Sequence, residues 1–148
     1  MTRTTLRLVG RILTMNGQRR LLGSFNMGRW PMRPPQAIGA QVSHPGRQVV
    51  ALCGDGGLAM SMGDLLSLRQ LKLPVKIVVF RNDALAFVEL EMKAAGFVDF
   101  ATDLDNPDFA KMAEAAGLPG LTAERPEHAA RGLGRVYPRT GAVCPTRA

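Results

Sequence analysis

The chain has 148 residues, 46% of them hydrophobic, and a formal net charge of +7 at pH 7. This length is typical of one domain with a buried core, and no apolar run is long enough for a membrane span. Two cysteines argue against a disulfide framework, and the N-terminus lacks the pattern of a secretory leader, so we expect a cytoplasmic protein.

The positive charge lies at the two ends of the chain. Residues 1–50 hold eight arginines and no acid, residues 128–148 hold four arginines and no acid, and all twelve acids lie in residues 51–127. A functional nucleic-acid surface normally mixes Lys with Arg and adds aromatic side chains. These ends have no Lys and are rich in Arg, Pro and Gly, so we expect no specific nucleic-acid partner.

The first half of the chain predicts a βαβ unit. A short helix over residues 36–41 comes first, after two prolines. The Val/Ile-rich runs 48–53 and 75–80 are typical of strands buried on both faces. Residues 58–73, which lie between them, have a helical apolar face made of Met60, Met62, Leu65, Leu66, Leu68 and Leu71. Strand, helix and strand in this order predict parallel strands with a right-handed crossover.

Further along the chain, Asn106 is expected to cap a helix, with Pro107 in its first turn. Its apolar face would be Phe109, Met112, Ala113 and Ala116, and Gly117 would end it. Another short helix is expected from Pro126-Glu127. His44 and His128 have no partners at catalytic or metal spacing and are expected on the surface, and Cys53 is expected in the core.

Polar residues follow both predicted strands of the βαβ unit. Gly54-Asp55-Gly56-Gly57 follows the first strand and Asn82-Asp83 the second. Ligands of open parallel sheets bind at the carboxyl ends of the strands, where both motifs fall. Asp and Asn offer the oxygen ligands that suit Mg²⁺, and glycine N–H groups can approach a phosphate closely. The alternative is that Asp55 caps a helix and Asn82 makes a turn, with no ligand.

The motif CGDGG, followed after 25 residues by Asn82, resembles the thiamine diphosphate motif of the pyruvate oxidase and quinone-dependent pyruvate dehydrogenase family. The similarity extends over most of residues 15–130. It implies an α/β fold, a three-layer α/β/α sandwich with a mainly parallel sheet. We expect a divergent segment at 1–14, a truncated thiamine diphosphate-binding domain at 15–134 and a divergent tail at 135–148.

The resemblance also assigns roles to single residues. Asp55, Asn82 and the carbonyl of Ala84 would bind Mg²⁺, and Gly56 and Gly57 would present N–H groups to the diphosphate. The residues around the cofactor would be Asp83, Ala84, Leu85, Ala86, Phe87 and Val88. Phe87 matches a family position that moves on activation, and its alternative is an ordinary core position. Arg81 and Ala86 stand where the family usually has Asn and Gly.

The resembled enzymes are homo-oligomers, some membrane-associated, that decarboxylate pyruvate oxidatively. They use a Glu from an N-terminal domain and FAD bound by a middle domain, and neither domain is in this chain. We therefore expect it to bind thiamine diphosphate and Mg²⁺ but not FAD, to be inactive alone, and to pair with a separate chain that carries the missing domains. The alternatives are an acetolactate synthase-like or other 2-oxo acid decarboxylase, a binding-only module, or a non-functional remnant.

Two segments depart from the resembled family. Residues 27–33 read MGRWPMR, where the family has a segment like HGSMANA, and a one-base shift of codons relates the two. Residues 135–148 can be related in the same way to the family's closing strand. We interpret both as a disruption of the reading frame, and we expect a sheet that is incomplete at both ends and lacks the closing strand.

Overall fold

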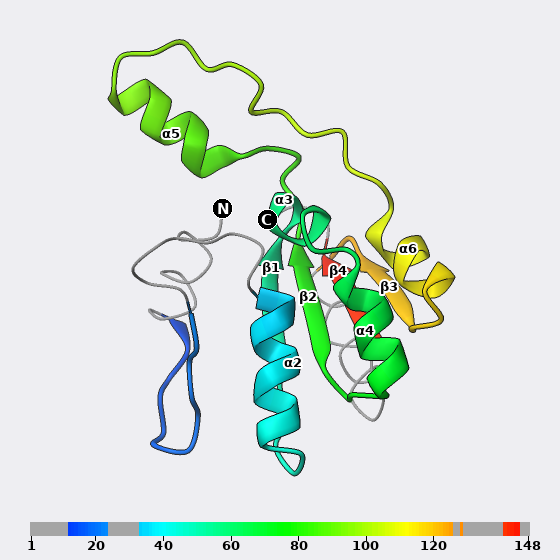
Figure 1. Cartoon of the computed structure of the whole chain (residues 1–148). Helices are drawn as coiled ribbons and strands as arrows, with labels where there is room; N and C mark the ends of the chain where they lie inside the picture. Colours follow the sequence, from blue (N-terminus) through cyan, green and yellow to red (C-terminus); the bar gives the residue numbers. More distant parts are fainter. Residues whose placement is uncertain (1–11, 24–32, 126–127, 129–140, 146–148) are drawn as a thin grey trace.

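The computed structural model describes residues 12–23, 33–125, 128 and 141–145 (Figure 1). In chain order the named elements are α2 (Arg33–Ser43), β1 (Val50–Gly54), α3 (Asp55–Ala59), α4 (Asp64–Leu71), β2 (Lys76–Phe80), α5 (Ala86–Ala94), α6 (Phe109–Ala115), β3 (Gly120–Ala123) and β4 (Gly141–Pro145). Within these ranges, no helix has the length and apolar character needed to cross a lipid bilayer.

The strands form one parallel sheet in the order β1-β2-β4-β3. Gly54, at the end of β1, lies opposite Phe80, at the end of β2. The predicted α/β class and the predicted parallel strand pair are therefore confirmed. This register also means that the residues directly after the two strands emerge side by side.

The expectation that the closing strand is absent is wrong. β4 lies inside the sheet, where Val143 is opposite Val78 of β2 on one side and Leu121 of β3 on the other. Glycine and small or β-branched residues dominate its sequence, GAVCP, which suits a central strand of a parallel sheet. Without β4, the edges of β2 and β3 that face it would have unpaired backbone N–H and C=O groups.

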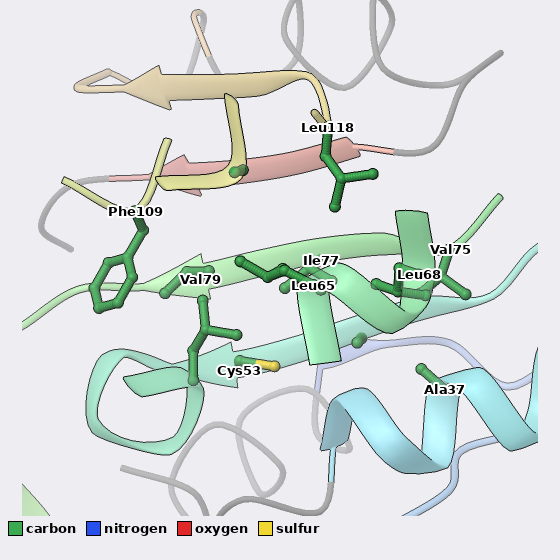
Figure 2. Packing of buried hydrophobic residues seen from close by; sticks show 12 residues of the cluster. Ala37, Cys53, Leu65, Leu68, Val75, Ile77, Val79, Phe109 and Leu118 are labelled. Carbon is green, nitrogen blue, oxygen red and sulfur yellow. The ribbon is translucent and has the colours of Figure 1, made fainter. Parts of the chain in front are cut away.

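Helices α2, α4 and α6 pack on one face of the sheet. Figure 2 shows their side chains converging with those of β1 and β2. The cluster of buried residues is Ala37, Ala51, Cys53, Leu58, Leu65, Leu68, Val75, Ile77, Val79, Phe109, Ala113 and Leu118. Alternate residues of β1 and β2 contribute to it, as expected when one face of a strand meets a helical layer. Cys53 is among them, as predicted.

The helix predicted over residues 58–73 is in fact two helices. α3 ends at Ala59, and a turn over 60–63 separates it from α4. In that turn, Ser61 N–H bonds to Leu58 and Asp64 N–H to Ser61, three residues back instead of four. Met60 at the turn, and Leu66 and Leu71 within α4, are exposed although they belong to the predicted apolar face. Leu65 and Leu68 are buried, as predicted.

The predicted cap of α6 is also wrong. Asp108, not Asn106, precedes the helix, and its Oδ1 accepts the N–H groups of Ala110 at 3.0 Å and Lys111 at 3.1 Å. The helix therefore starts two residues later than predicted. Met112 of the predicted apolar face is exposed. Gly117 ends the helix with a positive φ of 75°, as predicted.

The other local predictions have mixed outcomes. α2 is longer than residues 36–41, because its two prolines lie in the first turn, where a missing N–H costs nothing. His44 and His128 are exposed, as predicted. The helix expected from Pro126-Glu127 and most of segments 27–33 and 135–148 lie outside the described residues.

Helix α5 and the chain that follows it extend away from the sheet, beyond the ends of β1 and β2 (Figure 1). No residue of α5 is buried. Three apolar side chains in the following segment are largely exposed: Phe97 at 67%, Val98 at 85% and Phe100 at 82%. We call residues 86–101 the apolar arm.

Candidate functional site

The site lies where β1 and β2 end. Asp55 directly follows β1, starts α3 and is only 1% exposed. Its Oδ2 accepts the backbone N–H of Asn82 at 2.9 Å, the backbone N–H of Asp83 at 2.7 Å and the side-chain amide of Asn106 at 3.0 Å. Three donors on one oxygen satisfy it fully and fix the rotation of the buried carboxylate.

The second oxygen of Asp55 faces the other predicted metal ligands. Oδ1 accepts the Gly56 N–H at 2.9 Å. One terminal atom of the Asn82 amide lies 3.2 Å from this Oδ1 and 3.1 Å from the Ala84 carbonyl oxygen. With Nδ2 in that position, the amide donates to both oxygens. The structure thus brings together the three groups that the sequence predicted as metal ligands.

Asp83 has a left-handed backbone, with φ of 54°. This region is costly for most residues but tolerated by Asp. The conformation is fixed from several sides: its N–H bonds to Asp55, its carbonyl accepts Leu104 N–H at 2.9 Å, and its Oδ1 accepts Arg81 Nε at 2.6 Å and Asn106 Nδ2 at 3.0 Å. A strained residue held so firmly is typical of a ligand-binding turn.

The ion pair with Asp83 also shows where Arg81 points. Its Nε meets the Asp83 carboxylate rather than the Asp55 oxygens. The guanidinium therefore balances the charge of the Asp83 carboxylate.

Residues 102–104 return from the apolar arm and pair with the turn after β2. Leu85 N–H donates to the Thr102 carbonyl at 2.7 Å, and Ala84 and Asp103 form an antiparallel bridge. A Cβ at Gly56 would lie 2.8 Å from Leu85 Cδ2 and 3.1 Å from Leu104 Cδ1. A side chain at Gly56 would therefore displace the ends of the Leu85 and Leu104 side chains, and the Gly56 N–H already serves Asp55.

The remaining predicted cofactor residues are close to this centre in the chain. Gly57 is half-buried in α3, and Leu85 lies in the turn. Ala86, Phe87 and Val88 form the first turn of α5 and are half-buried. Phe87 is not part of the hydrophobic core, so the alternative of an ordinary core position is wrong.

Asn106 is the residue of this site that sequence reasoning missed. It was interpreted as a helix cap because it precedes Pro107, yet its amide contacts Asp55 and Asp83 instead. The signal that could have found it is Asp108, a second capping residue two positions later that makes a cap at Asn106 redundant.

Among the described residues, no three His, Cys, Asp or Glu side chains lie together as a metal cluster. The candidate donor set contains a single carboxylate, completed by an amide and a backbone carbonyl. Such a set is poor for Zn²⁺ and suits a hard cation that takes its other ligands from water and phosphate.

Cys53 lies two residues before Asp55, and its buried thiol is protonated. Burial raises the pKa of its thiol to about 12, and the nearby Arg33 guanidinium opposes this only in part. The thiol is neutral at physiological pH and acts as a small core residue. Nucleophilic chemistry from this side chain is not expected.

The sequence matches the family described as "Thiamine pyrophosphate enzyme, C-terminal TPP binding domain" over residues 4–144. It is 41% identical to YdaP of Bacillus subtilis, across 65% of this chain and 17% of that protein. It is 35% identical to the acetolactate synthase large subunit of Pyropia yezoensis, across 68% of this chain and 18% of the relative. It is 36% identical to pyruvate oxidase of Lactiplantibacillus plantarum, across 63% of this chain and 16% of the relative.

The chain spans less than a fifth of the length of these relatives. The identities to acetolactate synthase and to pyruvate oxidase are nearly equal, so they support the broader family rather than one activity. The matched range includes residues 27–33, and the disruption of the reading frame there stays a prediction. Sequence, fold and the match over residues 4–144 agree: the chain belongs to the thiamine pyrophosphate enzymes, as their C-terminal TPP-binding domain.

Proposed function

We propose that this chain binds Mg²⁺ and thiamine diphosphate as the cofactor-binding part of a pyruvate-oxidising enzyme. Asp55, Asn82 and the Ala84 carbonyl are the proposed metal ligands. One observation carries the proposal: an atom of the Asn82 amide lies within 3.2 Å of both Asp55 Oδ1 and the Ala84 oxygen. These groups come from the residues that directly follow two neighbouring strands.

The spacing of these groups fits a small hard cation. Mg²⁺ binds oxygens at about 2.0–2.1 Å in octahedral geometry, so neighbouring ligand oxygens lie about 3 Å apart. The separations of 3.2 and 3.1 Å are close to that value. Rotation of the amide by half a turn replaces the Nδ2 donor with Oδ1. The same position then offers three oxygens, which a cation can hold together and which repel one another without it.

The cofactor itself would lie against the turn after β2. Asp83, Leu85, Ala86, Phe87 and Val88 are the proposed surroundings, and their partial exposure leaves side chains accessible to a ligand. Gly57, in the first turn of α3, is the proposed donor to the diphosphate. The Gly56 N–H serves Asp55 and is a weaker candidate. When bound, thiamine diphosphate supplies the electron sink for decarboxylation of a 2-oxo acid.

The apolar arm supports the proposal that the chain works with further domains. Phe97, Val98 and Phe100, in the segment that follows α5, are exposed apolar side chains. Exposed apolar side chains this close together mark an interaction surface. We propose that the occupant is the polypeptide that carries the pyrimidine-binding and flavin domains, in a homo-oligomeric enzyme. FAD would be bound there and not by this chain.

Pyruvate is the proposed substrate because the stretch over residues 72–93 resembles pyruvate oxidase more than acetolactate synthase. Acetolactate synthase activity is the second candidate, supported by relatives with nearly equal identity. Addition of a polypeptide that carries the proposed pyrimidine-binding and flavin domains, followed by assay of acceptor reduction and of acetolactate formation, distinguishes the two.

Thermal melting of the purified chain tests the binding proposal. With both Mg²⁺ and thiamine diphosphate at about 100 times the dissociation constant, the free energy of unfolding should rise by about 2.7 kcal/mol. Either ligand alone, or both with EDTA, should give little change. Asp55→Ala should lose the rise, and the matched control Asp105→Ala, which removes an exposed acid nearby, should keep it.

If the chain melts cooperatively but neither ligand shifts the transition, the metal and cofactor roles are wrong. If it shows no cooperative melt, the alternative of a non-functional, frame-disrupted remnant is favoured.

A further inference from the structure

We infer that Asn106 is a positioning residue of the proposed metal site, holding the Asp55 carboxylate so that only Oδ1 faces the cation. The inference rests on the function proposed above. Its basis is one amide nitrogen that donates to two carboxylates, Asp55 Oδ2 at 3.0 Å and Asp83 Oδ1 at 3.0 Å. Asn106 would touch neither metal nor cofactor and would act through these two side chains.

The hydrogen bonds of Asp55 explain what this contact does. Oδ2 accepts three donors, and the Asn106 amide is the one that comes from a side chain. The other two are backbone N–H groups of the turn after β2. With three donors on Oδ2, a cation would be bound through Oδ1, which accepts the Gly56 N–H and faces the Asn82 amide.

The charge balance explains why an amide suits this position. Asp55 and Asp83 are two carboxylates that share a neighbour, and Arg81 compensates one of them. A neutral donor between them relieves their repulsion and leaves one negative charge for a divalent cation. A cationic donor such as Lys would cancel that charge and compete with the metal.

The backbone around Asn106 is fixed by its own contacts. Leu104 N–H bonds to the Asp83 carbonyl on one side, and Asp108 caps α6 on the other. Pro107 restricts the chain between them. Asn106 therefore links the turn after β2 to the hydrophobic core through Phe109, which is 3% exposed.

Binding of Mn²⁺ measured by electron paramagnetic resonance, with saturating thiamine diphosphate, tests the inference on the full chain. Asn106→Ala should raise the dissociation constant of Mn²⁺ by about 10- to 100-fold, the usual effect of losing an outer-shell partner. The matched control is Asp108→Ala, which removes the cap of α6 two residues away but keeps the amide. It should lower the melting temperature and leave the dissociation constant within about 2-fold.

Three outcomes separate the two claims. Weaker Mn²⁺ binding in Asn106→Ala, with unchanged binding in Asp108→Ala, supports the positioning role. Equal binding in wild type and Asn106→Ala overturns it while the proposed metal site stands. Absence of Mn²⁺ binding in the wild type overturns the metal site and this inference together.

A second measurement on the wild type covers the case in which Asn106→Ala does not fold. The chain has four asparagines, Asn16, Asn26, Asn82 and Asn106. Labelling them with ¹⁵N gives four side-chain amide pairs. The Asn106 pair should exchange slowly with solvent and shift on addition of Mg²⁺ and thiamine diphosphate, unlike that of exposed Asn16. An Asn106 pair that exchanges as fast as that of Asn16 contradicts the inference.

Discussion

The backbone N–H of Asp83 donates to Oδ2 of the buried Asp55 at 2.7 Å, and this bond holds Asp83 in the left-handed region at φ of 54°. The turn after β2 is thereby tied to the residue after β1. The left-handed backbone of Asp83 and the orientation of the Asp55 carboxylate depend on each other, because neither residue can move without breaking this hydrogen bond.

Substitution of Asp83 separates the effect of its side-chain contacts from the effect of its left-handed backbone. Asp83→Ala loses the contacts to Arg81 and Asn106 and keeps the unfavourable φ, whereas Asp83→Gly loses the same contacts but adopts that φ freely. We expect the Gly variant to be more stable than the Ala variant by about 1 kcal/mol. Urea unfolding of both measures this, and equal stabilities would show that the left-handed backbone carries no strain.

Asn82→Asp should have opposite effects on the two forms of the protein. Without metal it places a second carboxylate within about 3 Å of Asp55, where like charges repel. With Mg²⁺ the added charge strengthens the donor set. The melting temperature in EDTA should fall and the rise on adding Mg²⁺ and thiamine diphosphate should grow. An unchanged melt in EDTA would contradict the contact between these two side chains.

Gly120→Ala should destabilise the fold strongly. A Cβ at Gly120, the first residue of β3, would lie 2.1 Å from the Ala110 carbonyl oxygen of α6. Helix and strand must separate to admit it, at a cost of roughly 1–3 kcal/mol or more. The control is Gly39→Ala in α2, where a Cβ meets nothing within 4 Å and should stabilise by about 0.5–1 kcal/mol. Denaturant titration compares the two, and a neutral Gly120→Ala refutes the close approach.

The buried thiol of Cys53 should make stability depend on pH in the alkaline range. Its pKa rises from an ordinary 9.0 to about 12 on folding. Above pH 9 the unfolded chain loses this proton while the folded chain keeps it, so the free energy of unfolding falls as pH rises toward 12. The slope is at most about 1.4 kcal/mol per pH unit. Cys53→Ala should lack this part of the slope, measured by urea unfolding at several pH values.

The apolar arm should make the isolated chain self-associate. Phe97 and Phe100 are 67% and 82% exposed, and no partner covers them in the isolated chain. Replacing both with Ser should reduce the sedimentation coefficient at high concentration, because apolar area is removed from the surface. The control is Val42→Ser, which changes an exposed apolar residue of α2 outside the arm. A similar decrease in the control would mean that the arm has no special role.

Much of the central fold follows from local sequence. The runs 48–53 and 75–80 and the intervening apolar residues were sufficient to predict β1, β2 and their parallel pairing, since a βαβ unit is encoded by periodicity and glycine turns. The same reasoning placed Asp55 and Asn82 at neighbouring strand ends. These residues lie 27 positions apart, within one supersecondary unit, so their proximity needs no knowledge of the rest of the chain.

Features that depend on distant contacts could not be obtained in this way. β4 takes its central place because β2 and β3 leave unpaired backbone groups, which pattern alone does not reveal in a tail rich in Arg and Pro. The break over residues 60–63 likewise interrupts an apolar pattern that continues across it in the sequence.

Sequence by itself determined the thiamine pyrophosphate enzyme family and the parallel strand pair, and it predicted the candidate metal ligands, because these depend on short motifs. Tertiary structure decided that Asn106 reaches Asp55 across 51 positions, and that Asp108 rather than Asn106 caps α6. The physical reason is competition for donors. A buried carboxylate must find hydrogen-bond partners wherever the fold supplies them, and only the folded chain shows which side chains lie within reach.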